Sequence, residues 1–539
     1  MKLTLEGIRR NREQWAAAGI SLPSYDPEET SRRAVQAPVW VHFGIGNIFR
    51  IFIAGIADDL MEKGLMDRGI TCAETFDPDI VDRIYAPFDC LGLNVILNPD
   101  GTRNLRVCGA MAEAVKVSPE ENASWERMKE VFRSPSLQMV SFTITEKGYE
   151  LRTPGGDFLP FVKADIENGP DRGKGAMAVV AGMLWERFRA GGTPIALVSM
   201  DNCAKNGKLL KASVGTVAQG WLERGTVSRE FIAWLEDESR VAFDCTMIDK
   251  ITPRPSPETA RDLEDLGVEN MGPVITGKRT YIAPFANAEK PQYLVIEDRF
   301  PNGRPPLEQG FGVYLGDFET VCKCERMKVT ACLNPAHTAV GPLGVVLGQE
   351  RFADMLRDIP AAFRMVRRVI EDEGMPVVED PGILSPRAFA EEVFERFTNI
   401  YLGDTNLRLA TDASQGLGVR FGETIRAWKR REGSAEGLTA IPLGIAGFFR
   451  YMMGVDDEGN GYELAPDPLA EEIHGALSSV CLGEPDSLKD QLRPYLSNSA
   501  LFGVDLYAAG LGSKIEEMLR EMIAEKGAAR NTLEKYNPA

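Results

Sequence analysis

The sequence contains very few histidines: His42, His337 and His474 are the only three in 539 residues. A metal site built from several histidines is therefore nearly excluded. The nine cysteines are an odd number spread along the chain. Cys322 and Cys324 are too closely spaced for the common zinc motifs, and no second pair completes a set. We expect no bound metal, and we expect free thiols in a reducing compartment.

The sequence also lacks long apolar segments. No run approaches the roughly eighteen uninterrupted apolar residues that a transmembrane helix needs. The N-terminal segment MKLTLEGIRRNREQW carries charges among its apolar residues and lacks the hydrophobic region of a signal peptide. We therefore expect a cytoplasmic protein that does not bind a membrane.

Basic residues are in deficit, with 61 Lys and Arg against 79 Asp and Glu and a net charge of −18. This balance argues against nucleic acid or an anionic membrane as a partner. A small anionic substrate remains compatible with it, because a pocket can hold local positive charge in a negative protein. We expect a monomer or a small homo-oligomer that acts on a small molecule.

The chain is too long for one hydrophobic core, so at least two domains are expected. Its first half alternates β-rich runs with helical patterns, which predicts a parallel α/β sheet. Expected strands are 39–43, 70–74, 138–145 and 194–200. Expected helices are 48–63, 176–189 and one that begins at Ser118, followed by Pro119.

Beyond about residue 320 the apolar periodicity is almost wholly helical. Expected helices there are 385–401, 421–431, 442–453 and 468–482. We therefore predict an α/β Rossmann-type domain over residues 1–290 and a mostly α-helical domain over 291–539. The site is expected in the cleft between them.

A glycine turn follows the first of these strands. Gly44 and Gly46 stand directly before the helical stretch that starts at Ile48. Such a turn allows close backbone approach, and the free N–H groups of the following helix can bind a pyrophosphate. Phe49 occupies the place of a third glycine, and Arg50 offers a charge for the phosphates. A plain glycine turn is the alternative interpretation.

Glu74 ends the second expected strand, where an acid would bind the ribose hydroxyls of adenosine. Such an acid would repel the 2′-phosphate of NADP, so it favours NAD. The strand, the turn, the helix and the acid together predict an NAD site. Its residues are expected to be Gly44, Gly46, Asn47, Ile48, Arg50 and Glu74.

A second signal is a cluster of Lys328, Asn334 and His337 within ten residues. When hydride moves between nicotinamide and a substrate carbon, a proton must move at the substrate oxygen. A desolvated lysine whose pKa approaches neutrality can move that proton, and Asn and His can hydrogen-bond the oxygen. A solvated lysine beside a packed histidine is the structural alternative.

Other candidates are less specific. Asn202 follows an expected strand, at the strand end where α/β sheets bind ligands, although Asn is also common in turns. Asp249 lies in the segment Met-Ile-Asp-Lys-Ile-Thr-Pro. Arg408 can supply a cation to a substrate, or it can form an ion pair on a helix surface.

Five blocks, in order along the chain, resemble those of the polyol-specific long-chain dehydrogenases, the mannitol dehydrogenase family. They are Val-His-Phe-Gly-Ile-Gly-Asn-Ile-Phe-Arg (41–50), Thr-Ile-Thr-Glu-Lys-Gly-Tyr (143–149), Ser-Met-Asp-Asn (199–202), Met-Ile-Asp-Lys-Ile-Thr-Pro (247–253) and Val-Ile-Glu-Asp-Arg-Phe-Pro-Asn-Gly-Arg-Pro (295–305). The resemblance extends from about Val39 to past Pro468. It implies a Rossmann-type domain, a helical second domain and catalysis without a metal.

The resemblance also assigns roles. Lys328 is implied as general acid/base, with Asn202, Asn334 and His337 around the reacting oxygen. Asp249 and Arg408 match further substrate-binding positions.

Three departures from the family pattern stand out. Five residues rather than four separate Lys328 from Asn334, and Lys250 replaces an arginine. The family's substrate-contacting lysine is replaced by Gly416, for which Arg420 is a candidate substitute.

The activity implied is NAD-linked interconversion of a ketose or ketouronate and its alcohol. The first candidate substrate pair is fructuronate and mannonate, and the second is fructose and mannitol. Reduction of tagaturonate is a further alternative. A catalytically silent sugar-acid or nucleotide sensor is the alternative from a different class.

The extra residue after Lys328 leads to a structural prediction. In a regular helix it would rotate Asn334 by about 100° relative to Lys328. A π-bulge absorbs one residue without that rotation, and a widened turn across Ala331 to Asn334 also relieves the clash of Pro335 with the Ala331 carbonyl. The alternative is a new helix with Asn334 as N-cap and Pro335 at its first position.

Overall fold

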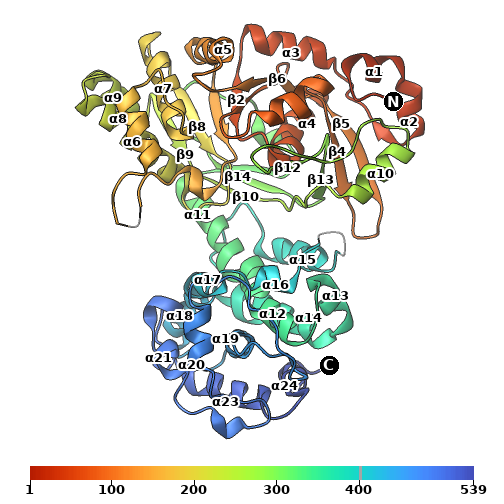
Figure 1. Cartoon of the computed structure of the whole chain (residues 1–539), viewed down its shortest axis with the longest axis vertical. Coiled ribbons are helices and arrows are strands. Elements are labelled where there is room, and N and C mark those ends of the chain that lie inside the picture. The colour runs from red at the N-terminus through yellow and green to blue at the C-terminus, as the bar shows by residue number, and fades with distance from the viewer. Residues whose placement is uncertain (154, 400–402) are drawn as a thin grey trace. The chain divides into compact units, whose positions relative to one another are not determined.

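The structure is a computed structural model that describes residues 1–153, 155–399 and 403–539. The chain forms two compact units, Met1–Cys322 and Lys323–Ala539 (Figure 1). The boundary expected after residue 290 falls inside the first unit. The reason is a small sheet in which β14 (Tyr293–Glu297) pairs with β10 (Thr246–Asp249) and β15 (Val313–Gly316) pairs with β14.

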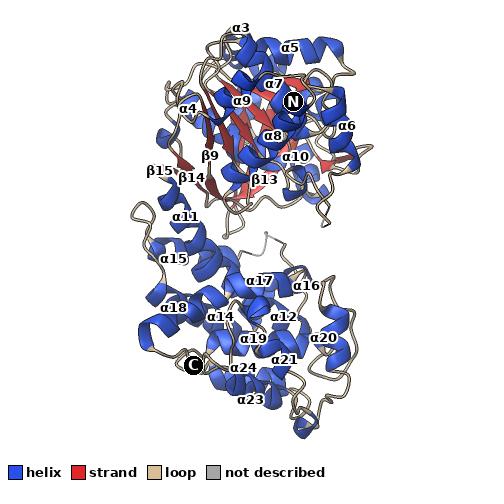
Figure 2. Ribbon diagram, turned by 90° about the vertical axis from the view of Figure 1, so that its left-hand side faces the viewer, coloured by secondary structure: helices blue, strands red, loops and turns tan. Residues whose placement is uncertain are grey.

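A six-stranded sheet is the centre of the first unit, shown in red in Figure 2. Its strands in spatial order are β6 (Met111–Lys116), β3 (Ile70–Glu74), β2 (Trp40–Phe43), β7 (Met139–Phe142), β8 (Ile195–Ser199) and β9 (Val241–Asp244). Every neighbouring pair is parallel. The order reverses at β2, as in a Rossmann-type doubly wound fold. The four expected strands are confirmed within a few residues at each end.

Helices cover both faces of this sheet. The α- and π-helices of the first unit are α1 (Leu5–Arg10), α2 (Arg12–Ala17), α3 (Pro27–Gln36), η1 (Phe49–Ile53), α4 (Ala54–Glu62), η2 (Val81–Tyr85), α5 (Asn122–Arg133), α6 (Pro160–Asn168), α7 (Ala176–Arg189), α8 (Asn206–Glu223), α9 (Arg229–Glu236) and α10 (Pro257–Asp265). Val41 and Phe43 of β2 pack in one core with α5, α7 and α8. Trp40 packs in a second core with α4 and β14. Strands buried on both faces explain the mainly apolar β-rich runs of the sequence.

Two further sheets lie in the first unit. One has the order β1 (Ile20–Ser21), β5 (Arg103–Cys108), β4 (Gly92–Leu97) and β13 (Phe285–Glu289), and the other is the two-stranded hairpin of β11 (Val274–Ile275) and β12 (Tyr281–Ile282). The helix expected at Ser118 begins at Asn122 instead. Ser118 closes a turn ahead of it, because its Oγ accepts from the Glu120 N–H at 3.3 Å.

Figure 2 shows the second unit as helices joined by loops. These elements are α11 (Phe318–Arg326), which crosses the unit boundary, η6 (Met327–Cys332), α12 (Leu333–Val346), α13 (Phe352–Asp358), α14 (Pro360–Arg367), η7 (Arg368–Gly374), α15 (Pro386–Phe397), α16 (Asn406–Leu409), α17 (Ala413–Arg420), α18 (Gly422–Glu432), α19 (Ala440–Met452), α20 (Ala470–Ala476), α21 (Arg493–Leu496), α22 (Ser499–Phe502), α23 (Gly512–Met522) and α24 (Ala528–Tyr536). The mostly helical second domain is thus confirmed.

Of the helices expected in this unit, some are confirmed and one forms only in part. Ser385 caps α15 as expected, by accepting from the Ala388 N–H. That helix ends at Phe397, and the last residues expected in it, 400 and 401, lie outside the described residues. The helices expected at 421–431 and 442–453 correspond to α18 and α19, whereas only the short α20 forms within 468–482.

Helix α12 lies at the centre of the second unit and packs closely on α19. A Cβ at Gly444 would lie 2.8 Å from the Ala339 Cα, and a Cβ at Gly447 would lie 2.5 Å from the Leu343 Cγ. The two glycines therefore allow a close approach that fixes α12 in place. Among the described residues, no helix has both the length and the apolar character that a membrane crossing requires.

Candidate active site

The glycine turn directly follows β2. Gly44 has a φ of +91°, and a Cβ there would lie 2.3 Å from the Thr143 carbonyl oxygen, so only glycine fits. A Cβ at Gly46 would meet nothing within 4 Å. The helical segment that follows begins with an Arg50 N–H donating to the Gly46 carbonyl at 3.2 Å. The turn therefore combines a rigid first glycine with open space at the second.

Side chains from neighbouring elements hold the turn. The Thr143 hydroxyl donates to the Gly44 carbonyl at 2.7 Å, and the Tyr85 hydroxyl donates to the Ile45 carbonyl at 2.7 Å. His42 lies 2.8 Å from Thr143 through its Nε2 and stacks on Phe49. Burial lowers the pKa of His42 to about 3, so its ring is neutral at physiological pH. Sequence reasoning did not find this support.

Arg50 does not face the turn as expected. Its side chain is buried and donates to the carbonyls of Ala283 and Pro284, each at 2.6 Å. Burial lowers the pKa of this guanidinium. Arg50 thus links η1 to the segment that leads into β13. The expected contact between Arg50 and a phosphate is therefore wrong.

Glu74 ends β3, adjacent to β2, as expected. Its Oε1 accepts from the N–H groups of Phe76 at 2.7 Å and Asp77 at 3.0 Å. Burial raises the pKa of this carboxyl, against the backbone N–H groups that lower it. Glu74 therefore braces the following loop, and its role toward a ribose stays a prediction.

These features fit a dinucleotide. Asn47, the first residue after the second glycine, has a buried side-chain oxygen without a hydrogen-bond partner among the described residues. The open space at Gly46 and the N–H groups of a helix start lie at the same turn. The N–H groups of the helix start can donate to a bound pyrophosphate, whereas the Asn47 oxygen, which only accepts, suits a hydroxyl donor of the cofactor. Ile48, which is partly buried, follows it.

The end of β8 carries Asn202, which is exposed. Beside it, the buried Asp201 accepts from the Tyr149 hydroxyl and from the Cys203 N–H. Burial raises the pKa of Asp201. Asn206 was missed by sequence reasoning: its Nδ2 donates to the carbonyls of Ser199 and Asp201, each at 3.1 Å. An Asn-Gly pair at a helix start is its only sequence signal.

Asp249 is buried at the end of β10, where it lies opposite Tyr293 of β14. Lys250, which stands where the family pattern has arginine, donates to the Glu289 carbonyl at 2.5 Å. The structure thus places Asp249 in the first unit at a strand end, and its substrate contact stays a prediction.

The segment from Met327 to Cys332 in the second unit is a π-helix, which confirms the predicted bulge, although it lies a few residues earlier than the turn expected across Ala331 to Asn334. The Leu333 N–H donates to the Lys328 carbonyl, five residues back, rather than four. Helix α12 then starts at Leu333, so the alternative with Asn334 as N-cap is wrong. The widened turn absorbs the extra residue as expected.

Two contacts fix this π turn, and neither could be found from local sequence. Gly374 of η7 is so close that a Cβ there would lie 2.4 Å from the Ala331 carbonyl oxygen. The Thr424 hydroxyl of α18 donates to the Thr330 carbonyl at 2.9 Å. Lys328 and Asn334 are both partly buried on this braced segment.

His337 lies one turn into α12. Its ring packs 5.0 Å from Phe352 and 4.4 Å from Phe397, measured between ring centroids. The ring is only partly buried. An apolar seat of this kind fixes the ring orientation while leaving part of the side chain accessible.

The two candidate cations differ. Arg408 is exposed and pairs with Asp404 four residues earlier, which matches the ion-pair interpretation. Arg420 is partly buried, its guanidinium donates to the Thr338 hydroxyl at 2.8 Å, and burial lowers its pKa. A Cβ at position 416 would lie 2.6 Å from the Arg420 Nε. Arg420 therefore occupies the space that a side chain at Gly416 would need.

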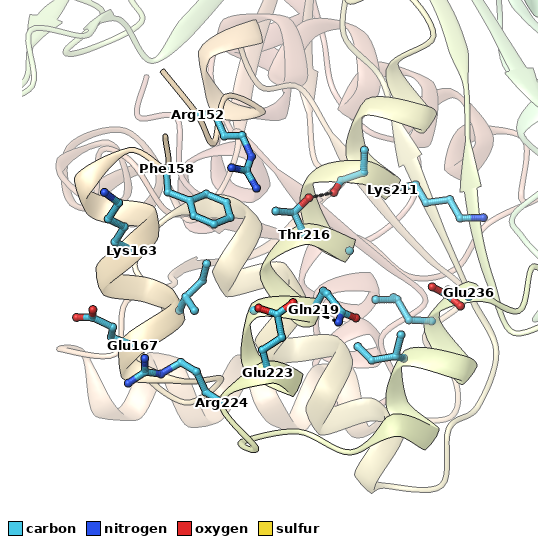
Figure 3. A pocket seen from close by; sticks show the side chains of 16 residues that line it. Arg152, Phe158, Lys163, Glu167, Lys211, Thr216, Gln219, Glu223, Arg224 and Glu236 are labelled. Atoms are coloured by element: carbon cyan, nitrogen blue, oxygen red, sulfur yellow. Dashed lines mark hydrogen bonds between the residues drawn. The ribbon is translucent and has the colours of Figure 1, made fainter. Parts of the chain in front are cut away.

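A separate groove of about 760 Å³ lies between α6, α8 and α9 (Figure 3). Charged side chains such as Lys163, Glu167 and Glu223 rim it, and no residue of the glycine turn or of the strand ends lines it. It therefore lies apart from the predicted site. Among the described residues, no cluster of three or more His, Cys, Asp or Glu side chains is arranged to hold a metal ion.

A doubly wound domain with a dinucleotide turn, and a helical domain presenting lysine, asparagine and histidine on one braced segment, define a nucleotide-dependent dehydrogenase. Two family models match: the mannitol dehydrogenase Rossmann domain over residues 39–309 and the mannitol dehydrogenase C-terminal domain over 320–523. The chain therefore belongs to the mannitol dehydrogenase family.

Similar proteins cover the whole chain. A D-mannonate oxidoreductase of Thermotoga maritima is 47% identical over 99% of both chains. A D-mannonate oxidoreductase of Escherichia coli is 30% identical over 90% of this chain and 92% of that one. A crystal structure of a D-sorbitol dehydrogenase in substrate-free form superposes with a TM-score of 0.78 at 26% identity, covering 97% of this chain and 98% of that chain.

Proposed function

We propose that this protein is an NAD-dependent D-mannonate oxidoreductase that interconverts D-mannonate and D-fructuronate. The observation that carries the proposal is the 47% identity, over essentially full length, to a relative of that name. A cytoplasmic location is part of the proposal, since a reducing compartment suits cysteines that form no disulfide among the described residues. We also propose a monomer or a small homo-oligomer.

Each residue has a part in the proposed reaction. The glycine turn of Gly44 and Gly46 would hold NAD, which would supply the acceptor for the hydride of the alcohol carbon. Lys328 accepts the proton from the same alcohol and returns it in the reverse direction. Asn334 and His337, on the helix that continues from the π turn, donate hydrogen bonds to the substrate oxygens. Asn202 and Asp249 are the predicted contributors from the first unit.

Arg420 supports a substrate with a carboxylate. Its guanidinium is desolvated, and the partner seen for it is a neutral hydroxyl one residue after His337. A desolvated cation is stabilised when an anion binds beside it. Arg420 also fills the place of the lysine that the family pattern has at Gly416. We therefore propose Arg420, rather than the paired Arg408, as the main carboxylate contact.

The proposal is tested by following NADH absorbance with a panel of hexonates, hexitols and ketouronates. D-fructuronate with NADH and D-mannonate with NAD should give the highest kcat/KM. Faster turnover of fructose and mannitol, or of tagaturonate, would transfer the assignment to that substrate. If the protein binds NADH but turns over no compound of the panel, the result would favour the alternative of a catalytically silent sugar-acid or nucleotide sensor.

Replacing Arg420 should separate the substrates. Arg420→Gln is expected to raise KM for fructuronate by roughly 10- to 100-fold, the loss expected for a charge-assisted hydrogen bond, while KM for fructose changes little. Arg408→Gln is the matched control and should have a smaller effect on fructuronate. Equal effects of Arg420→Gln on both substrates would remove the reason for preferring a uronate.

Cofactor preference tests Glu74. The wild-type protein should have a higher kcat/KM with NAD than with NADP, and Glu74→Gln should narrow that ratio by about tenfold, or roughly 1.4 kcal/mol. The amide keeps an acceptor for the loop N–H groups but removes the charge that repels a 2′-phosphate. A wild-type preference for NADP would contradict this role of Glu74.

A further inference from the structure

A hairpin far along the chain is fastened to the loop that follows β3. Asp77 accepts hydrogen bonds from the hydroxyls of Thr276 at 2.6 Å and Thr280 at 2.5 Å. Asp79 accepts from the Gly277 N–H at 2.9 Å. These three hydrogen bonds bring the turn between β11 and β12 against the loop after Glu74. The loop and the hairpin are therefore held together by hydrogen bonds and do not form two independent loops.

Phe76 lies in this loop, and 67% of its surface is exposed. Its N–H is held by the Glu74 carboxylate. Lys278, from the hairpin, places its Nζ 5.6 Å from the centre of the Phe76 ring. Arg83 donates to the Ile275 carbonyl at 2.8 Å and adds another tie. A firmly held aromatic ring that remains mostly in solvent contributes little to the core, which points to a ligand.

The position of the ring identifies the ligand group. In doubly wound domains the pyrophosphate lies at the glycine turn and the adenosine ribose at the end of the adjacent strand. Here those places are Gly44 to Gly46 and Glu74, on neighbouring parallel strands. The adenine base is attached to that ribose, and Phe76 follows Glu74 by two residues. An exposed aromatic face is a suitable stacking surface for a base.

We propose that Phe76 is the stacking surface for the adenine ring of the cofactor, and that the hairpin carrying Lys278 fixes this surface. The inference rests on the proposed NAD-dependent function. It adds a contact at the adenosine end, away from the reacting atoms, so Phe76 should affect cofactor affinity and leave the chemical step unchanged.

The test measures binding to the full-length protein without turnover. NADH is titrated by its fluorescence, AMP by calorimetry, and reduced nicotinamide mononucleotide serves as a probe without adenine. Phe76→Ala should lower the affinity for NADH and for AMP by about tenfold, which is within the range of base stacking on an aromatic ring. The affinity for the mononucleotide should not change. Phe76→Trp should restore the affinity.

Phe311→Ala is the matched control, because Phe311 is another exposed phenylalanine of the first unit, with 59% of its surface exposed. It should change none of the three affinities. Unchanged NADH affinity in Phe76→Ala, with wild-type protein that binds NADH, would overturn the inference and leave the proposed function intact. Equal weakening of the mononucleotide would also overturn it, by indicating a general disturbance. Wild-type protein that binds no NADH would overturn both.

Discussion

Lys328→Ala should lower kcat by roughly 100-fold or more, the size expected when a general acid/base is removed, with little change in NADH affinity. The lysine is placed on a π turn against which Gly374 packs closely and whose Thr330 carbonyl accepts from the Thr424 hydroxyl, so its position is defined by the second unit. The glycine turn that is proposed to bind the cofactor belongs to the first unit. Single-turnover rates with saturating NADH, together with fluorescence titration, separate the two effects.

Lys489→Ala is a suitable control for the loss of a lysine, because Lys489 is exposed in the same unit and lies outside the Lys–Asn–His segment. Its kcat should match the wild type. If Lys328→Ala retains turnover within a few-fold of the wild type, the proton is moved by another group and the proposed mechanism is wrong. A loss of NADH affinity together with kcat would indicate damage to the fold instead.

The features predicted from sequence are those whose cause is local. The glycine turn was readable because Gly44 and Gly46 stand between a strand and a helix. The π turn was readable because an extra residue and Pro335 are both incompatible with a regular helix at one place in the chain. The short β-rich runs were readable as strands because their residue types and their alternation with helical patterns are also local features.

The features that sequence did not reveal depend on contacts between distant segments. Arg50 was expected at a phosphate because it follows the turn, yet its partners are the carbonyls of Ala283 and Pro284, more than 230 positions away. Gly374 looks like an ordinary glycine, and only the packing of η7 on η6 shows why no side chain fits there. Local patterns carry no information about such pairs.

The same packing leads to a second prediction of large effect. Gly374→Ala should lower kcat by about 10- to 100-fold and should destabilise the second unit by about 1–3 kcal/mol, as overpacking does. The added Cβ would lie 2.4 Å from the Ala331 carbonyl oxygen and 3.2 Å from its Cα. Backbone cannot move aside as a flexible side chain can, so the π turn itself must shift. Lys328 lies on that turn, and small displacements of a catalytic group are costly to the rate.

Gly475→Ala gives the matched control, because Gly475 lies in helix α20 and a Cβ there would meet nothing within 4 Å. That change should leave kcat unaltered and leave stability the same or slightly raised, since alanine is the better helix former. Thermal unfolding and kcat are measured for both variants, with NADH affinity as the check on the first unit. If Gly374→Ala unfolds at a lower temperature but keeps the wild-type kcat in the folded protein, the π turn tolerates the shift, and Lys328 does not depend on this bracing for its catalytic position. A lower kcat with intact NADH affinity would instead show that Lys328, the proposed general acid/base, is positioned by a helix whose sequence lies more than forty residues away.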